Sequence, residues 1–357
     1  MDKPSIEARV ARGDVFDGET WDGLDLSGID LGGCILTEVS LRGANLTGAR
    51  LSEATFSQCD LSEANIEKAA VRHTKFIQSK CVGANLRHTV SVSASLVESD
   101  FSEANFENSD LALANILQTK LDRAKLGQTN LDRVAFANVT MADADLGGAN
   151  LFKTTLYQVD LRTTKLDGAK FDTTIFTESK FGAKNFKRAK LSLVQFIDTD
   201  LEGACFDEAS IEQTNFKGAK LVKATFAKAR GKMAIFHQAN LTAAVMVDAD
   251  LYQGIFQQAT AEALDATGAN LEQSIWIEAK CRASRFIRAN LTYADFTHAD
   301  LSMSDLAGAK MYRTRLHRAV QDGTNLPPGS SAALGDEADL AEAEDWWSLQ
   351  VQKRRGA

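Results

Sequence analysis

ANLTGARLSEATFSQCDLSEANI, residues 44–66, repeats one short pattern of side chains without interruption. A large apolar residue recurs every five positions, at Leu46, Leu51, Phe56, Leu61 and Ile66, and a small residue stands two positions before each of them. A period of five fits neither a helix, which repeats roughly every 3.6 residues, nor an extended strand, which repeats about every two. The pattern therefore predicts a solenoid, in which each short unit buries its apolar side by stacking on its neighbours.

The five-residue frame runs from Phe16 to Leu316 and so has 61 central positions, of which 57 hold Leu, Phe, Ile, Val, Met, Trp or Cys. The exceptions are Ser91, Gly231, Ala261 and Ala266. We expect a local one-residue shift at Ser91 and a hole in the core at Gly231. Lys184 stands where a small inward residue is the rule, so we expect it to reach toward solvent or to cause a bulge.

The repeated A-(D/N)-L-x-x unit resembles the pentapeptide-repeat family over roughly residues 14–326. This resemblance implies an all-β solenoid, a right-handed quadrilateral β-helix with four pentads, about twenty residues, in each coil. The sequence supports the longer period independently, because ten of the Phe residues are separated from one another by multiples of twenty positions. They are Phe16, Phe56, Phe76, Phe136, Phe176, Phe196, Phe216, Phe236, Phe256 and Phe296. We therefore expect a column of stacked Phe rings along one face.

The chain divides into four expected segments: an N-terminal helical cap (1–13), the repeats (14–326), a linker (327–331) and a C-terminal acidic and aromatic helix (332–357). A solenoid needs caps because its end coils otherwise expose core and unpaired backbone. Ser5 is the expected N-cap of the first helix, and Gly13 its stop. The C-terminal helix either folds back as a cap, pairs with another chain, or docks on a partner. Its candidate contact residues are Leu340, Trp346, Trp347 and Val351.

Apolar side chains also occupy outward positions on the Phe-rich face. These residues form a candidate protein-binding stripe: Ile77, Val97, Leu117, Tyr157, Ile197, Ile235, Ile255, Ile275 and Ile277. One interpretation is that β-branched residues suit a ladder of strands. The other is an exposed apolar patch, which usually marks an interaction site.

The sequence contains no recognisable chemistry of catalysis, and we expect no enzyme activity, cofactor or metal site. All five His residues fall at outward polar positions. His298 and His317 can approach each other on adjacent coils, but no third ligand is evident. The Cys residues show no metal-ligand spacing and act as small core residues. We expect a smooth surface without a cleft, which suits an enzyme poorly.

Charge and composition bound the possible partners. The net charge is −8, with an acidic segment 1–64 (12 acids, 5 bases) and a mildly basic segment 160–232 (14 bases, 10 acids). A second face interleaves bases with aromatic residues, which can indicate nucleic-acid binding. We do not expect it here, because the chain is acidic overall and has no nucleic-acid motif. We find no membrane span and no signal-peptide pattern, so the expected location is cytoplasmic.

The leading hypothesis is a non-enzymatic protein-interaction scaffold, with an unidentified protein partner and a possible homodimer. The opening GLDLSGIDLGG (residues 23–33) is similar to pentapeptide-repeat segments found with bacterial type VI secretion accessory proteins. One alternative is a DNA-mimicking protein that binds DNA gyrase, as in the quinolone-resistance branch of the family. Another is a secreted effector that recruits a host protein through its C-terminal tail.

Overall fold

The computed structural model describes residues 2–328 and 333–355, with side chains up to Trp347 in the last helix. The chain folds as two compact units, Met1–Phe181 (unit 1) and Gly182–Ala357 (unit 2). Each unit is a solenoid whose successive coils pair in parallel. The all-β solenoid class expected from the repeat is therefore confirmed.

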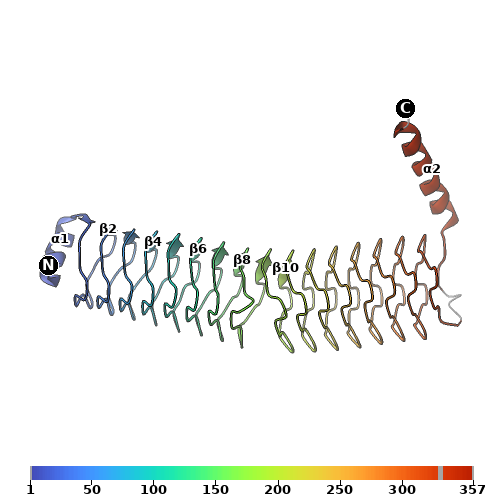
Figure 1. Ribbon diagram of the computed structural model, residues 1–357, viewed down its shortest axis with the longest axis horizontal. Helices are drawn as coiled ribbons and strands as arrows, with labels where there is room; N and C mark the ends of the chain where they lie inside the picture. Colours follow the sequence, from blue (N-terminus) through green and yellow to red (C-terminus); the bar gives the residue numbers. More distant parts are fainter. Residues whose placement is uncertain (1, 329–332, 356–357) are drawn as a thin grey trace. The chain divides into compact units, whose positions relative to one another are not determined.

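Unit 1 begins with helix α1 (Lys3–Arg12) and continues through nine short parallel strands (Figure 1). The strands are β1 (Phe16–Asp17), β2 (Ile35–Thr37), β3 (Thr55–Ser57), β4 (Lys75–Ile77), β5 (Ser95–Val97), β6 (Asn115–Leu117), β7 (Ala135–Ala137), β8 (Thr155–Tyr157) and β9 (Ile175–Thr177). Each pairs with the next at a spacing of twenty residues, as Phe56 with Phe76 does between β3 and β4. We call the side of the coil that carries these strands the strand face.

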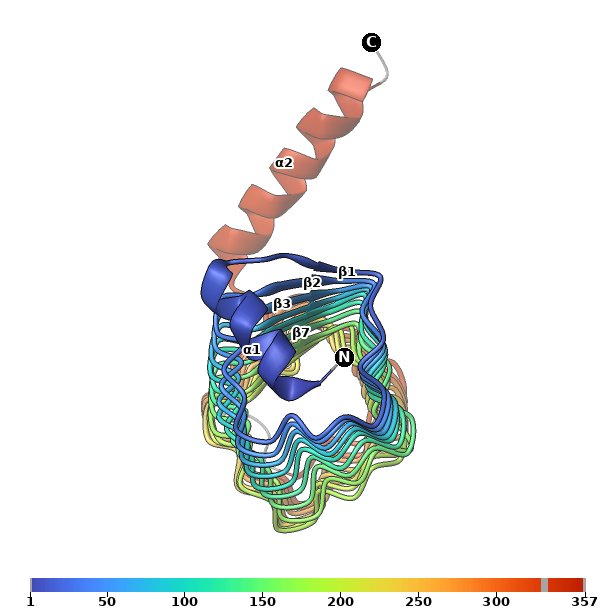
Figure 2. The same cartoon turned by 90° about the vertical axis from the view of Figure 1, so that its left-hand side faces the viewer.

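The other three sides of each coil pair through single bridges with the same spacing. In the first coils these bridges are Thr20 with Ser40, Asp25 with Asn45 and Asp30 with Arg50. Four pentads therefore complete one coil, and the end view of unit 1 shows its coils superposed (Figure 2). Unit 2 contains β10 (Gln195–Ile197) and then continues in bridges, such as Ile235 with Ile255. It ends with helix α2 (Ala338–Arg355).

Helix α1 covers the first coil of unit 1 (Figure 2). Its N-cap is Asp2, whose carboxylate accepts the Ser5 N–H at 3.2 Å, so the expectation of Ser5 as N-cap is wrong. Gly13 ends the helix in the left-handed conformation, φ 77°, as expected. Ile6 is fully buried, and the Arg9 guanidinium lies 4.7 Å from the centre of the Phe16 ring. The helix therefore closes the apolar end of the coil beneath it.

Aromatic rings stack along the core of unit 2, as the Phe phase predicts. The ring centres of Phe216 and Phe236 are 5.0 Å apart, and those of Phe236 and Phe256 are 4.9 Å apart, with nearly parallel planes. A second column includes Phe206 and Phe226, whose rings stack at 4.8 Å. Phe226 meets Phe236 edge to face at 90°. Such perpendicular contacts stabilise beyond the burial of apolar area alone.

Ser91 keeps its regular inward position, so the expected one-residue shift is wrong. It is buried, as is Thr89 two residues before it. The Ser91 hydroxyl donates to the Thr89 hydroxyl oxygen at 3.0 Å, and the Thr89 hydroxyl donates to the Leu86 carbonyl at 2.9 Å. Because these polar groups find partners inside the coil, the frame tolerates them without moving.

By contrast, the expected bulge at Lys184 is present, since the Lys184 N–H donates to the Gly182 carbonyl only two residues away, at 2.8 Å.

The expected hole at Gly231 is absent. A Cβ placed there would lie 2.8 Å from Leu251 Cδ2 and 2.9 Å from Ile211 Cγ1, so the neighbouring coils fill the space. We expect Gly231→Leu to lower the free energy of unfolding by about 1–3 kcal/mol through overpacking. Chemical denaturation followed by circular dichroism measures this. The exposed Lys232→Leu is the control, with an expected change within about 0.5 kcal/mol. An increase in stability for Gly231→Leu would mean that a cavity exists after all.

Candidate functional site at the C-terminal helix

The predicted protein-binding stripe lies on the strand face, in two separate columns. In unit 1, Ile77, Val97, Leu117 and Tyr157 occupy the position after the centre, in strands paired in register. In unit 2, Ile235, Ile255 and Ile275 pair in the position before the centre, while Ile197 and Ile277 follow their centres. Tyr157 is 36% exposed and the others are half-buried. Binding through this stripe remains a prediction.

The largest exposed apolar side chains of the predicted tail contact lie on α2. Leu340 is 42% exposed, Trp346 59% and Trp347 62%. The side chain of Val351 lies outside the described residues. These three side chains do not bury themselves against the coils, so they do not form a packed cap. Polar residues hold the helix instead.

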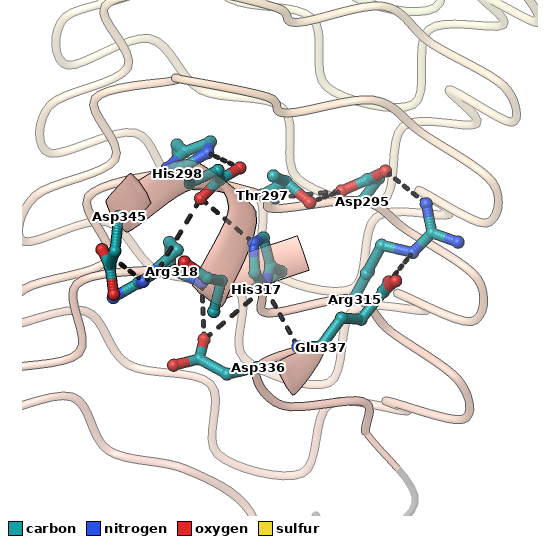
Figure 3. Close-up of polar contacts among 11 residues, drawn as sticks. Asp295, Thr297, His298, Arg315, His317, Arg318, Asp336, Glu337 and Asp345 are labelled. Carbon is teal, nitrogen blue, oxygen red and sulfur yellow. Dashed lines mark hydrogen bonds and ion pairs between the residues drawn. The ribbon is translucent and has the colours of Figure 1, made fainter. Parts of the chain in front are cut away.

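The chain rejoins the solenoid just before α2. The Leu334 N–H donates to the Thr314 carbonyl and the Leu316 N–H donates to the Leu334 carbonyl, both at 2.8 Å. This pairing extends the strand face by one short segment after the linker. It brings Asp336, Glu337 and the first turns of α2 over the last complete coil (Figure 3).

Arg318 makes several of the contacts between the coil and α2 (Figure 3). Its Nη2 lies 2.8 Å from Asp345 Oδ1 and donates to the Ala341 carbonyl at 3.0 Å. Its Nε lies 3.7 Å from Glu344 Oε2, and its backbone N–H donates to Asp336 Oδ1 at 2.7 Å. The hydrogen bond to Asp345 is the largest of the influences that raise the pKa of Arg318. The side chain therefore stays charged and contacts two acids of the tail, and the Arg318 backbone binds a third.

His317 lies fully buried beneath this network, although its position faces out of the coil as expected. Helix α2 and the segment before it cover the ring. The Glu337 N–H donates to His317 Nδ1 at 3.0 Å. On the other side of the ring, Nε2 lies 3.4 Å from Glu344 Oε2. Nε2 is nevertheless a buried atom without a hydrogen bond in the part of the chain that the structure describes.

Glu344 joins His317 to His298 from the preceding coil. His298 Nε2 lies 3.1 Å from Glu344 Oε1, and the two imidazole ring centres are 5.8 Å apart. Burial opposes ionisation of Glu344, but the neighbouring His298 and His317 outweigh it and lower the pKa of this carboxyl group. The expected approach of the two histidines is therefore confirmed. The third group, which the sequence did not reveal, comes from α2.

Protonation of His317 follows from its hydrogen bond. Because Nδ1 accepts the Glu337 N–H, the neutral ring carries its hydrogen on Nε2, facing Glu344. Asp336 Oδ1 lies 3.8 Å from Nδ1, which is too far for a hydrogen bond in this arrangement.

Unit 1 has a hollow of about 870 Å³, so the expectation of a surface without a cleft is wrong. Its lining residues are Asp122, Asn138, Val139, Thr140, Met141, Ala142, Gln158, Asp160, Arg162 and Thr163. The residue two positions after a pentad centre usually has a left-handed backbone conformation, as Thr173 does. Thr163, which lines the hollow, does not. A β-branched residue disfavours that conformation. Thr163 Oγ1 accepts the Asp143 N–H instead, at 2.9 Å.

Cys59, Cys81 and Cys281 are buried core residues, as expected, whereas Cys34, which was also expected to point inward, is half-buried. Desolvation raises the pKa of the Cys59 thiol to about 11, so that this sulfur is a poor nucleophile and metal ligand at neutral pH.

Among residues 2–328 and 333–355, no helix combines the length and hydropathy needed to cross a bilayer.

Comparisons with known proteins agree with this architecture. The family model for pentapeptide repeats matches in overlapping stretches that together span residues 25–90, 92–168, 174–230 and 267–326. A comparison with curated proteins finds no match.

Several solved structures are similar in fold. QnrB1, a plasmid-mediated fluoroquinolone resistance protein, is 16% identical, with 58% of this chain and 90% of that chain covered and a TM-score of 0.34. HetL, a pentapeptide repeat protein involved in heterocyst differentiation regulation from the cyanobacterium Nostoc sp. strain PCC 7120, is 19% identical. That match covers 88% of this chain and 96% of HetL, with a TM-score of 0.18.

Proposed function

Because the chain belongs to the pentapeptide-repeat family, we propose that it is a non-enzymatic scaffold that binds another protein through helix α2. The observation that carries this proposal is the exposure of Trp346 and Trp347, 59% and 62%, on a helix that other residues hold in place. Tryptophan is enriched among the residues that dominate binding energy in protein interfaces. Two adjacent, uncovered Trp side chains thus supply an anchor for a partner.

The polar contacts of α2 support the same function. Arg318 and the two histidines engage Ala341, Glu344 and Asp345, which leaves the neighbouring Trp side chains uncovered. A helix that is already docked loses less conformational freedom when a partner binds, and this pre-organisation strengthens binding. The acids around the tryptophans favour a partner whose contact surface is basic at its rim.

A DNA-mimicking role receives less support from the charge pattern. Residues twenty positions apart lie next to each other on neighbouring coils. Several such pairs join an acid to a base, and the ion pair neutralises both charges. Examples are Glu103 with Arg123, Glu208 with Arg188, and Asp295 with Arg315. A long, unbroken acidic column would suit a mimic of the phosphate backbone better. The partner could belong to a bacterial secretion system or to a host cell, and both identities remain proposals.

Replacing both Trp346 and Trp347 with alanine should abolish partner capture while leaving the fold intact. Each exposed Trp is expected to contribute about 2 kcal/mol to an interface, so the double variant should bind about 1,000-fold more weakly. The test is crosslinked capture from a lysate, quantified by mass spectrometry for both variants and the parent chain. The matched control is Tyr293→Ala with Tyr312→Ala, an exposed aromatic pair whose ring centres are 5.7 Å apart elsewhere in unit 2. Equal capture by the Trp variant would refute the proposal.

A further inference from the structure

We propose that His298, His317 and Glu344 form a binding site for a divalent transition-metal ion, Zn²⁺ being the best match. The ion would fasten α2 to the last coils of unit 2. One potential ligand atom from each residue lies within 4.8 Å of the others. The three residues come from two successive coils and from α2, so a bound ion would cross-link elements that are distant in the sequence.

Two distances in the cluster are close to the edge of a tetrahedron around zinc, each measured to a different oxygen of Glu344. Zinc bonds to His nitrogen and carboxylate oxygen are about 2.0–2.2 Å long, which places neighbouring ligand atoms roughly 3.3–3.5 Å apart. His298 Nε2 lies 3.1 Å from Glu344 Oε1, and His317 Nε2 lies 3.4 Å from Glu344 Oε2. The side chain of His298 is 40% exposed, so an ion can reach the three groups from this side.

The buried Nε2 of His317 is a second, independent indication. This residue is fully buried, yet Nε2 lacks a hydrogen-bond partner among the described residues and faces Glu344. Buried polar atoms rarely remain unsatisfied unless they serve a further role, such as contact with an ion. A metal ion placed among the three groups would use this atom.

Ligation through His317 Nε2 would require the groups around Nδ1 to rearrange. Metal binding through Nε2 requires the hydrogen to be on Nδ1, where it normally donates to a carboxylate or carbonyl group. Asp336 Oδ1, 3.8 Å from Nδ1, is the nearby carboxylate and would have to move closer to accept it. The Glu337 N–H would then give up its present bond to Nδ1. Ion binding should therefore alter the segment that leads into α2, which a structural readout can detect.

The ligand set indicates which ion fits. Two imidazoles and one carboxylate suit zinc and other transition ions, whereas Ca²⁺ and Mg²⁺ prefer oxygen ligands only. The surrounding charge also favours a cation, because four carboxylates outnumber two guanidinium groups. These are Asp336, Glu337, Glu344 and Asp345, against Arg315 and Arg318. Three protein ligands leave a fourth position for water.

The test is Zn²⁺ titration of the untagged, full-length chain after treatment with a chelator, in competition with a chromophoric chelator. We expect one ion per chain, and His298→Gln and Glu344→Gln should each weaken binding at least about tenfold. Both residues are partly exposed, so these variants should fold, which circular dichroism checks. His237→Gln is the control, a His of unit 2 that stands one residue after a centre, as His317 does. It should bind like the parent chain.

Two further readouts separate this site from incidental binding. Co²⁺ should give the visible absorption spectrum of a tetrahedral site in the parent chain and lose it in both variants. Zn²⁺, but not Ca²⁺ or Mg²⁺, should slow hydrogen exchange in residues 333–347 of the parent chain. If no ion binds, or if both variants bind Zn²⁺ as tightly as the parent, the proposal is wrong.

Discussion

Phe236→Ala should lower the free energy of unfolding of unit 2 by about 3–5 kcal/mol. Phe236 is fully buried, its ring stacks between those of Phe216 and Phe256, and Phe226 contacts it edge to face. Removing the ring leaves a cavity and breaks all three aromatic contacts at once. Each coil is stabilised mainly by its neighbours, so the loss should weaken the interfaces on both sides.

Guanidinium-induced unfolding followed by circular dichroism measures this effect. Phe236→Leu is the matched control, because it keeps most of the volume, and its expected cost is below about 1.5 kcal/mol. If Phe236→Ala costs no more than Phe236→Leu, the stacked column is not what stabilises these coils.

Arg318→Glu should release α2 from the last coil. The substitution replaces a cation that contacts Glu344, Asp345 and the Ala341 carbonyl with an anion that repels both acids. A released helix of this length is only marginally stable in water, so it should open frequently. Hydrogen exchange of residues 338–347 should accelerate on the order of tenfold or more.

The control for this release is Arg318→Lys, which keeps the charge but loses the paired geometry of the guanidinium group. We expect an intermediate rate of exchange for it. The amides of the Phe-lined coils, such as that of Phe236, should exchange at the parental rate in both variants. Unchanged exchange in α2 of Arg318→Glu would show that other contacts hold the helix.

The period of five predicted the inward residues well because burial depends only on position within the pentad. The stacked Phe column follows directly from that pattern, whereas the helix end at Gly13 follows from a separate helix-stop signal. The pattern failed where neighbouring coils compensate. Ile211 and Leu251 fill the space at Gly231, and Thr89 satisfies the hydroxyl of Ser91. Periodicity describes one pentad at a time and carries no information on such adjustments.

The candidate site was only half predictable. His298 and His317 fall one coil apart, so their approach follows from the twenty-residue spacing. Glu344 lies beyond the repeat and the linker, where no periodicity relates its position to the coils. The burial of His317 and its contact with Glu344 depend on where α2 docks. Within the C-terminal helix, the sequence alone identified Trp346 and Trp347 as candidate contact residues, because of their size.

Site-specific photo-crosslinking tests the central claim most directly. A photoreactive amino acid would replace Trp346 in one full-length chain and Tyr157, on the strand face of unit 1, in another, and both would be irradiated in cells. The account predicts a covalent adduct with a partner protein from position 346 and none from position 157. An adduct from position 157 with none from position 346 would contradict it and would place the binding surface on the strand face.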